Sequence, residues 1–371
     1  MTMTATSNHD PLRRLQRRLR RRRLDLLLVS QPENRRYLSG FTAADHGINE
    51  SAGVLLIPAA GAPWLLTDGR YRLQAAEEAG GFETMVYPRG LFALLRRLLK
   101  RLLPKRLAFE SHYLLHSVYL QLSKLAAELE VELVPLVGLV EEQRQLKSAS
   151  ELALIEEAVR LNEAVFAEVY QQLRPGLSER EVAGLIEETM RRRGAEGPSF
   201  PTIVAGGPNG AMPHAVPGER PLAEGEPIII DMGLKIGGYC SDMTRTVVLG
   251  QPDAKTIGIS RLVRQAQLAG LEALRPGVAG RHVDRLARRV IEAAGYGDYF
   301  GHGLGHGVGL NVHEGPSLNY RNRKLLRPGM VLTVEPGIYL PGWGGVRLEN
   351  MAVVTEQGCR LLNRDTTCLD F

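Results

Sequence analysis

Between Pro11 and Glu142, short apolar blocks alternate with amphipathic stretches. The blocks LDLLLVS, SAGVLLIP and APWLLTDGR, at residues 24–30, 51–58 and 62–70, predict β-strands. The stretches RLQAAEEAG and LFALLRRLLKRLL, at residues 72–80 and 91–103, have the helical period, and Pro104 ends the second. This alternation predicts an α/β domain over residues 11–142.

The pattern changes at residues 141–150, where EEQRQLKSAS is charged and weakly apolar. The stretch ELALIEEAVRLNEAVFAEVYQQLR follows at residues 151–174 and predicts a long helix. We therefore expect a second domain over residues 146–371, and an α+β fold class for the chain.

The second domain contains an internal repeat. LRPG occurs at residues 173–176 and again 101 residues later at 274–277, each time before a helical pattern. Four further pairs recur at a shift of 104: Leu222 and Leu326, Gly225 and Gly329, Asp231 and Glu335, Gly233 and Gly337. Because four positions keep one spacing, we favour a duplication over chance similarity of two α/β units.

Composition excludes several classes of protein. Hydrophobic residues make up 44% and charged residues 23% of the 371, and the mean hydropathy is −0.13, as in globular rather than disordered or collagen-like chains. The most apolar window, residues 52–66, is broken by Pro58, Gly61 and Pro63. It is shorter than the ~20 residues that cross a bilayer, so we expect no transmembrane helix.

The formal net charge of +5 arises from one segment. Eight arginines lie between Arg13 and Arg23, and the remaining 38 basic residues face 41 acidic ones. We interpret this run as the solvated face of a first helix, with weak contact to an anionic surface or nucleic-acid binding as alternatives. The apolar stretch after it is too short for a signal peptide, so we expect a cytoplasmic protein without nucleic-acid or membrane partners.

Three cysteines, Cys240, Cys359 and Cys368, are an odd number without paired spacing. This argues against a disulfide framework and a structural zinc site, and it indicates a reducing compartment. We interpret the three as small apolar side chains rather than nucleophiles.

Two pairs of carboxylates flank predicted turns of the second domain. A hairpin loop at residues 237–238 would place residue 231 opposite residue 244, with Asp242 diagonal to Asp231 at about 7–8 Å between backbones. Glu335 and Glu349 would face each other across the turn LPGWGG, centred near Gly342. Four carboxylates at one interface need cations, and two divalent ions would balance them, so the spacing predicts a metal site.

The glycine-rich segment GHGLGHGVGLNVHEGP, at residues 301–316, supplies further candidate ligands in His302, His306 and His313. We expect at least one of these histidines at the metal site. Four carboxylates with an imidazole suit Mn²⁺, Co²⁺, Fe²⁺ or Zn²⁺ better than an ion that prefers thiolates.

Five segments carry a family resemblance: FPTIVAGGPNGAMPHAVP, DMGLKIGGYCSDMTRT, HGLGHGVGLNVHE, TVEPGIY and GGVRLEN. Together they resemble the pita-bread metallopeptidases, specifically the prolidase and aminopeptidase P branch, over about residues 141–359. LLTDGRY, at residues 65–71, resembles the creatinase/prolidase amino-terminal domain. The resemblance implies a pita-bread catalytic domain with a pseudo-twofold duplication. It also implies an amino-terminal α/β domain that caps the active site or mediates homodimer formation.

The resemblance implies roles for nine residues. The implied metal ligands are Asp231, Asp242, His306, Glu335 and Glu349. The implied substrate or transition-state contacts are His214, His302, His313 and Arg347. Within these sets we expect His214, His313 and Glu335 to be catalytic, and His302 and Arg347 to bind substrate.

The implied reaction is hydrolysis of peptides with proline at the second position, by an Xaa-Pro dipeptidase or Xaa-Pro aminopeptidase. Two ions, Mn²⁺ or Co²⁺ before Zn²⁺ or Fe²⁺, would hold a bridging hydroxide. Glu335 would shuttle the proton, and His313 and His214 would stabilise the tetrahedral oxyanion. Proline explains the specialisation, because its amide nitrogen lacks the N–H that general peptidases bind.

Two positions depart from the family pattern. Asn350 stands where relatives often have Asp, and we expect it to alter the surroundings of the ligands rather than metal occupancy. Ser317 stands where some dipeptidases have an arginine that holds the product carboxylate, which weakens the assignment to dipeptides. Arg321, Arg323 or an arginine of the first domain are candidates to replace it.

Two alternatives lie within the same fold. A non-hydrolytic pita-bread protein, either a creatinase-like enzyme or a binding module, would lack some ligands, whereas all five positions hold competent residues here. Methionine aminopeptidases usually lack a full preceding domain. We therefore favour a proline-specific metallopeptidase.

Overall fold

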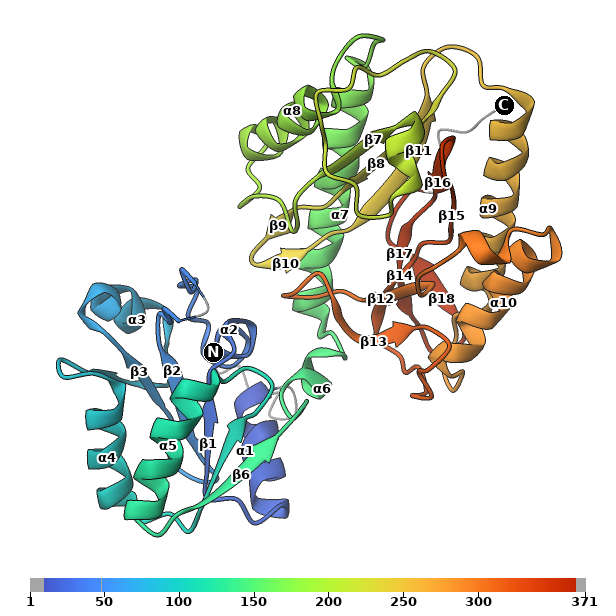
Figure 1. Cartoon of the computed structure of the whole chain (residues 1–371). Helices are drawn as coiled ribbons and strands as arrows, with labels where there is room; N and C mark the ends of the chain where they lie inside the picture. Colours follow the sequence, from blue (N-terminus) through green and yellow to red (C-terminus); the bar gives the residue numbers. More distant parts are fainter. Residues whose placement is uncertain (1–9, 48, 365–371) are drawn as a thin grey trace, which may run out of the picture. The chain divides into compact units, whose positions relative to one another are not determined.

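The structure, a computed structural model, describes residues 10–47 and 49–364. The chain divides into two compact units, and the boundary falls between Arg144 and Gln145. Each unit has its own sheets and helices (Figure 1).

The first unit is built on a six-stranded mixed sheet with strand order β4-β3-β2-β1-β5-β6. Its strands are β1 (Leu26–Val29), β2 (Val54–Pro58), β3 (Trp64–Thr67), β4 (Glu83–Val86), β5 (Arg106–Glu110) and β6 (Glu132–Leu136). Its helices are α1 (Pro11–Arg21), α2 (Pro32–Ser39), the 3₁₀ helix η1 (Gly69–Tyr71), α3 (Arg72–Glu78), α4 (Leu91–Leu102), α5 (His116–Glu128) and α6 (Glu141–Arg144). The three predicted strands and two predicted helices are confirmed as β1, β2, β3, α3 and α4.

Both faces of this sheet are covered by helices. In β1, Leu27 and Val29 pack with the apolar side chains of α1, α2 and α3, whereas Leu26 and Leu28 pack with those of α4 and α5. Alternate residues of a strand point to opposite faces, so a strand buried on both sides needs apolar residues throughout. This explains why the strand segments are continuous apolar runs.

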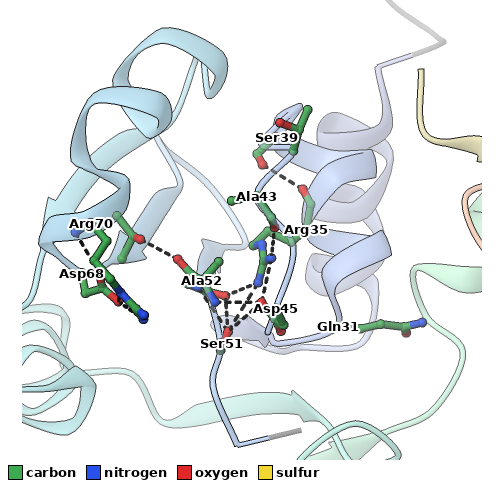
Figure 2. A network of polar contacts seen from close by, with 12 residues as sticks. Gln31, Arg35, Ser39, Ala43, Asp45, Ser51, Ala52, Asp68 and Arg70 are labelled. Carbon is green, nitrogen blue, oxygen red and sulfur yellow. Dashed lines mark hydrogen bonds and ion pairs between the residues drawn. The ribbon is translucent and has the colours of Figure 1, made fainter. Parts of the chain in front are cut away.

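A buried arginine holds the loop between α2 and β2 (Figure 2). Arg35 has no exposed surface, and its two Nη atoms donate to the carbonyl oxygens of Gly53 and Ala43, each at 2.6 Å. Its Nη2 also lies 3.0 Å from Asp45 Oδ1, which accepts a second hydrogen bond from Ala52 N. One side chain thereby ties both ends of the loop to α2.

The second unit has four long helices and several small sheets. The helices are α7 (Ala149–Tyr170), α8 (Glu179–Arg192), α9 (Ala254–Ala273) and α10 (Gly280–Ala293), with 3₁₀ helices η2 (Gly207–Ala211) and η3 (Gly297–Tyr299). The first-half strands are β7 (Ile203–Gly206), β8 (Pro227–Met232), β9 (Lys235–Ile236), β10 (Tyr239–Cys240) and β11 (Met243–Val248). The second-half strands are β12 (Gly305–Gly307), β13 (Glu314–Leu318), β14 (Val331–Val334), β15 (Gly337–Leu340), β16 (Gly344–Arg347), β17 (Asn350–Val354) and β18 (Cys359–Leu361).

The two halves of this unit repeat one design. Each begins with a helical hairpin, α7 with α8 and α9 with α10, joined through LRPG. Gly176 N donates to Leu222 O at 2.9 Å, and Gly277 N donates to Leu326 O at the same distance. The pairings of β8 with β11 and of β14 with β17 are both antiparallel. The predicted duplication is therefore confirmed in three dimensions.

Two expectations from composition can be compared with this fold. Within the described part of the chain, no helix combines the length and the apolar character that a bilayer crossing requires. Cys240 is buried and Cys359 is partly buried, and neither forms a disulfide within the described residues. Cys368 lies outside the described residues.

Candidate metal centre

A hairpin of the first half carries two of the predicted ligands. Asp231 lies near the end of β8 and pairs with Thr244 of β11, which is the predicted register. Gly237 and Gly238 form the tip with φ angles of 56° and 80°, a conformation that favours glycine. Asp242 directly precedes β11. Both carboxylates are buried, with exposed fractions of 9% and 4%.

The hairpin of β15 and β16 carries the other two carboxylates. Gly337 pairs with Arg347, so the turn is centred on Gly342, as the sequence predicts. Glu335 and Glu349 each lie two residues beyond that pair, at the same end of the hairpin. Glu349 is 1% exposed.

Side chains from both halves meet around these carboxylates. Thr244 Oγ1 donates to Glu349 Oε2 at 2.7 Å, and Arg347 Nη2 lies 2.7 Å from Asp231 Oδ2. Burial, and after it the neighbouring negative charges, raise the pKa of Asp242 and of Glu349 well above their usual values. The predicted gathering of four carboxylates where the halves meet is therefore present, and it is electrostatically costly.

His306 of β12 turns one ring nitrogen toward this cluster. Its Nε2 lies 3.2 Å from Glu335 Oε1 and 3.6 Å from Asp242 Oδ2. Its Nδ1 lies 3.1 Å from the carbonyl oxygen of Gly307. Because a carbonyl only accepts, Nδ1 carries the proton of the neutral ring, which leaves Nε2 available as a ligand atom. Without a metal ion, burial lowers the pKa of His306, but its contacts with Glu335 outweigh burial and raise it to about 9. Nε2 then also carries a proton, which a metal ion at this atom would displace.

Three of the predicted ligands form a compact donor set. Asp242, His306 and Glu349 each offer an atom that lies within 4.8 Å of the other two. Asp231 and Glu335 are not part of this set but line the same cavity. Asp231 forms an ion pair with Arg347, and Glu335 contacts His306.

Two carboxylate oxygens of the cluster lack a donor. Among the described residues, neither Asp231 Oδ1 nor Glu349 Oε1 has a hydrogen-bond partner, although both are buried. A buried anionic oxygen without a donor is unfavourable unless a cation supplies the missing interaction. The oxygen-rich donor set with one imidazole therefore fits a divalent metal ion.

All nine predicted site residues line one cavity of about 570 Å³. Part of its wall is apolar, and is formed by Phe200, Pro201, Ile203, Pro213, Ala215, Val216 and Pro217. One part of this cavity is thus charged and acidic, and another suits an apolar ligand group.

The other predicted histidines differ in their surroundings. His302 Nε2 lies 2.9 Å from the hydroxyl of Tyr339, and burial lowers the pKa of His302, which keeps its ring neutral. His313 stands at the cavity surface with its ring centre 4.4 Å from that of His306. Burial, and after it the charge of the nearby His306, lowers the pKa of His313. His214 is exposed in the same cavity.

Arg347 is bound within the protein. Besides Asp231, its guanidinium donates to Thr244 Oγ1 at 3.0 Å and to Tyr339 Oη at 2.9 Å, and its side chain is 3% exposed. The arginine orients Asp231 and neutralises part of the cluster. A direct contact of Arg347 with substrate stays a prediction.

Sequence reasoning did not single out Tyr339 and Thr244. Burial raises the pKa of Tyr339 to about 12, so its hydroxyl stays protonated between His302 and Arg347. Two signals were available for these residues. Thr244 is the residue opposite Asp231 in the predicted hairpin, and Tyr339 ends the segment TVEPGIY.

The two departures from the family pattern lie in different places. Asn350 Oδ1 accepts from Arg245 Nη2 at 3.0 Å, and Arg245 Nη1 donates to the backbone oxygen of Glu349. Asn350 therefore acts on the backbone beside a predicted ligand. Arg321 and Arg323 are exposed, and neither lines the cavity.

Both units match known families. Residues 153–356 match metallopeptidase family M24, and residues 11–146 match the creatinase/prolidase N-terminal domain. An uncharacterized peptidase of Bacillus subtilis is 39% identical over 339 residues, which cover 91% of this chain and 93% of that protein.

Solved structures resemble the whole chain. An Xaa-Pro dipeptidase from Bacillus anthracis has a TM-score of 0.90 at 38% identity, and an X-Pro aminopeptidase from Thermotoga maritima has a TM-score of 0.88 at 35%. Each match covers 96% of this chain and 98% of the other. The pita-bread fold with a creatinase/prolidase-like first domain is thereby confirmed.

Proposed function

The chain belongs to metallopeptidase family M24, and on that premise we propose that it is an exopeptidase that hydrolyses Xaa-Pro bonds with two divalent metal ions. The observation that carries the proposal is the donor set of Asp242, His306 and Glu349. Two buried carboxylate oxygens at this site, Glu349 Oε1 and Asp231 Oδ1, have no donor among the described residues. All of these residues line one cavity.

The ions would be held by Asp231, Asp242, His306, Glu335 and Glu349. Bound there, they would polarise the scissile carbonyl and lower the pKa of an attacking water. Arg347 alters the charge balance, because four carboxylates with one buried guanidinium carry about three net negative charges. Two divalent ions would leave about one positive charge, which favours the negative charge that develops on the substrate carbonyl.

Glu335 is the proposed proton carrier. Its Oε1 accepts a hydrogen bond from Thr333 Oγ1 at 3.0 Å, which fixes the carboxylate beside His306. Burial raises the pKa of Glu335, but the hydrogen bond and charge of His306 outweigh burial and lower it to about 2. This lowering depends on the charge of His306, which a metal ion at Nε2 would remove. With that charge gone, the Glu335 carboxylate would take a proton from water and pass it to the leaving proline nitrogen.

His313 and His214 are proposed to act on the substrate rather than on the metal. Both rings line the cavity at its accessible side. A ring N–H from either residue would stabilise the oxyanion that forms at the scissile carbonyl. The proline ring of the substrate would lie against the apolar wall near Phe200 and Val216.

The cavity favours peptides longer than two residues. A dipeptide ends in a carboxylate directly after proline, and a nearby guanidinium would bind it. Of the arginines in residues 145–364, only Arg347 lines the cavity, and it is held by Asp231. Ser317, Arg321 and Arg323 offer no replacement there. We therefore expect a tripeptide to be cleaved at least as well as a dipeptide.

Hydrolysis of an Xaa-Pro dipeptide and a matched Xaa-Pro-Xaa tripeptide tests the proposal, each with Mn²⁺, Co²⁺ or a chelator. We expect metal-dependent cleavage that favours the tripeptide. Cleavage of the dipeptide alone would assign a prolidase and overturn the length preference. No cleavage with any metal would favour the non-hydrolytic alternative, a creatinase-like enzyme or binding module.

A further inference from the structure

The arginine run of the first unit forms one face of α1. Arg14, Arg17, Arg18 and Arg21 follow the helical spacing that places side chains on one side. Together with Gln143 of α6 they line a cavity of about 370 Å³. This cavity belongs entirely to the first unit, and the proposed peptidase chemistry does not use it.

Most of the positive charge in this cavity is uncompensated. Arg18 donates to Leu139 O at 2.7 Å and pairs with Glu142. Arg14 Nη2 donates to the neutral hydroxyl of Tyr37 at 2.7 Å.

Arg17 and Arg21 have no side-chain hydrogen bond or ion pair within residues 10–47 and 49–364. Three of the four guanidinium groups therefore lack a carboxylate. Arg17 and Arg21 are exposed, and like charges at this spacing repel one another, so a bound anion would stabilise the cluster.

Gln143 adds a second, independent observation. Its residue surface is 6% exposed, and both polar atoms of its side chain, Nε2 and Oε1, are buried without a partner among the described residues. Arg14 Nε is likewise buried and unpartnered. Unpaired amide groups in the interior are costly, and they are rare unless a ligand or water completes them.

We propose that this cavity binds a small phosphate-bearing anion, of the phosphate monoester or diphosphate class. Guanidinium groups present paired N–H donors that match phosphate oxygens, and several of them neutralise its double charge. Gln143 also lines the cavity, and its unpartnered Nε2 would supply a neutral donor.

A compact ligand fits these contacts better than a nucleic-acid strand does. Strand binding uses an extended series of phosphate contacts and aromatic stacking surfaces. Here four arginines line one cavity together with a single buried amide, and among the described residues no aromatic side chain lines it. Arg13 and Arg20, elsewhere on the helix, are held by Asp10 and by the backbone oxygen of Ala59.

Two double variants with the same loss of charge separate a site from a general basic surface. Arg17→Gln/Arg21→Gln changes the cavity, and Arg13→Gln/Arg22→Gln changes α1 and its end outside the cavity. Titration calorimetry with inorganic phosphate and with pyrophosphate, at constant ionic strength, would compare both with the unmodified metal-loaded chain. Asp242→Asn joins the series, because phosphate also binds metal ions and this variant weakens the proposed metal site.

We expect saturable binding with one ligand per chain. Arg17→Gln/Arg21→Gln should weaken it by at least about tenfold, which is the scale of a lost charged hydrogen bond. Arg13→Gln/Arg22→Gln should change it by less than about twofold, and Asp242→Asn should retain it. Equal losses in both double variants, no saturable binding, or loss in Asp242→Asn would overturn the proposal.

Gln143→Met tests the role of the amide without changing the charge of the cavity. Methionine has a similar volume and removes the unpaired amide. We expect the ligand-free chain to melt at the same or a higher temperature, and phosphate to bind about three- to tenfold more weakly. Unchanged phosphate affinity would contradict the role of Gln143. Tighter binding of a 20-nucleotide single strand than of pyrophosphate, lost equally in both double variants, would assign the surface to nucleic acid instead.

Discussion

The two units both bury charged side chains, but they differ in how these charges are partnered. In the first unit, both Nη atoms of Arg35 reach acceptors (Figure 2). Its guanidinium carbon lies 5.5 Å from the centre of the Phe41 ring. Within residues 10–47 and 49–364, only its Nε lacks a partner. In the same part of the chain, Asp231 and Glu349 of the second unit each have a buried oxygen without a donor, beside two further carboxylates.

This difference separates a structural network from a binding site. A buried charge that is paired inside the protein holds segments together, and removing its partner is strongly destabilising. A buried charge that stays unpaired costs stability until a ligand completes it. The network of Arg35 therefore maintains the fold, whereas the carboxylate cluster is poised to bind cations.

Asp242→Asn should produce the largest effect on function. We expect metal content and peptide cleavage to fall by more than the roughly 10–100-fold that loss of an outer-shell partner causes. The metal-free variant should melt at the same or a higher temperature, because one repelling charge is gone.

Asp284→Asn is the matched control for Asp242→Asn. Asp284 is also buried, but it is paired with Arg288 at 2.9 Å. This variant should lose stability and keep its metal. Elemental analysis and thermal melting of both proteins measure the contrast, and full metal content in Asp242→Asn would exclude Asp242 as a ligand.

Arg35→Met should produce the opposite result in the first unit. The loss of the guanidinium leaves Asp45 and two backbone carbonyls without their donor, which should lower the free energy of unfolding by about 3–5 kcal/mol. Metal content of the second unit should not change. Urea unfolding measures the loss, and Arg70→Met, at a half-exposed ion pair with Asp68, should show a much smaller one.

His313→Ala should reduce catalysis without removing metal. If its ring stabilises the oxyanion, kcat should fall about 10²–10³-fold, equivalent to roughly 2.7–4 kcal/mol. Steady-state kinetics with the tripeptide, together with metal analysis, measures both quantities. An unchanged kcat would remove His313 from the proposed mechanism.

Glu110 of the first unit makes the free energy of unfolding depend on pH. This fully buried carboxyl accepts hydrogen bonds from Ser30 N and Gln31 N, yet burial dominates and raises its pKa from 4.5 to about 7. The folded chain therefore holds a proton that the unfolded chain releases. The resulting stabilisation is complete below about pH 4.5 and is lost as the pH rises to about 7, with a size of about 3 kcal/mol.

Urea unfolding of the metal-free chain and of Glu110→Gln between these pH values isolates this contribution. The difference in unfolding free energy between the two proteins should shift by that amount across the window. A constant difference would show that Glu110 titrates alike in the folded and unfolded chains.

Local patterns of sequence predicted much of the second unit. Gly237 and Gly238 predicted the register that pairs Asp231 with Thr244, and Gly342 marked the centre of the second turn. These inferences succeeded because a hairpin register depends on loop length and on residues close in the chain. The repeat predicted that both halves would contribute carboxylates to one interface.

Contacts between segments far apart in the chain could not be predicted in the same way. Arg347 reaches Asp231 across 116 positions of the chain, so its role as an internal partner was not apparent. The arginine run was predicted as a solvated face, and its helix is confirmed. That four of these arginines line one cavity with the buried amide of Gln143 depends on how α1 packs against α6.

Residue order alone accounts for the strands, the helices, the duplicated spacing and the family of the chain, because these depend on short-range periodicity and local turn geometry. It also identifies the residues able to bind metal. Packing between segments that are remote in the sequence determines which atoms of these residues are paired. Arg347 binds one oxygen of Asp231, and the other oxygen has no donor among the described residues. That assignment requires the folded chain, because a side chain's hydrogen-bond partners are set by whatever the tertiary structure brings within reach.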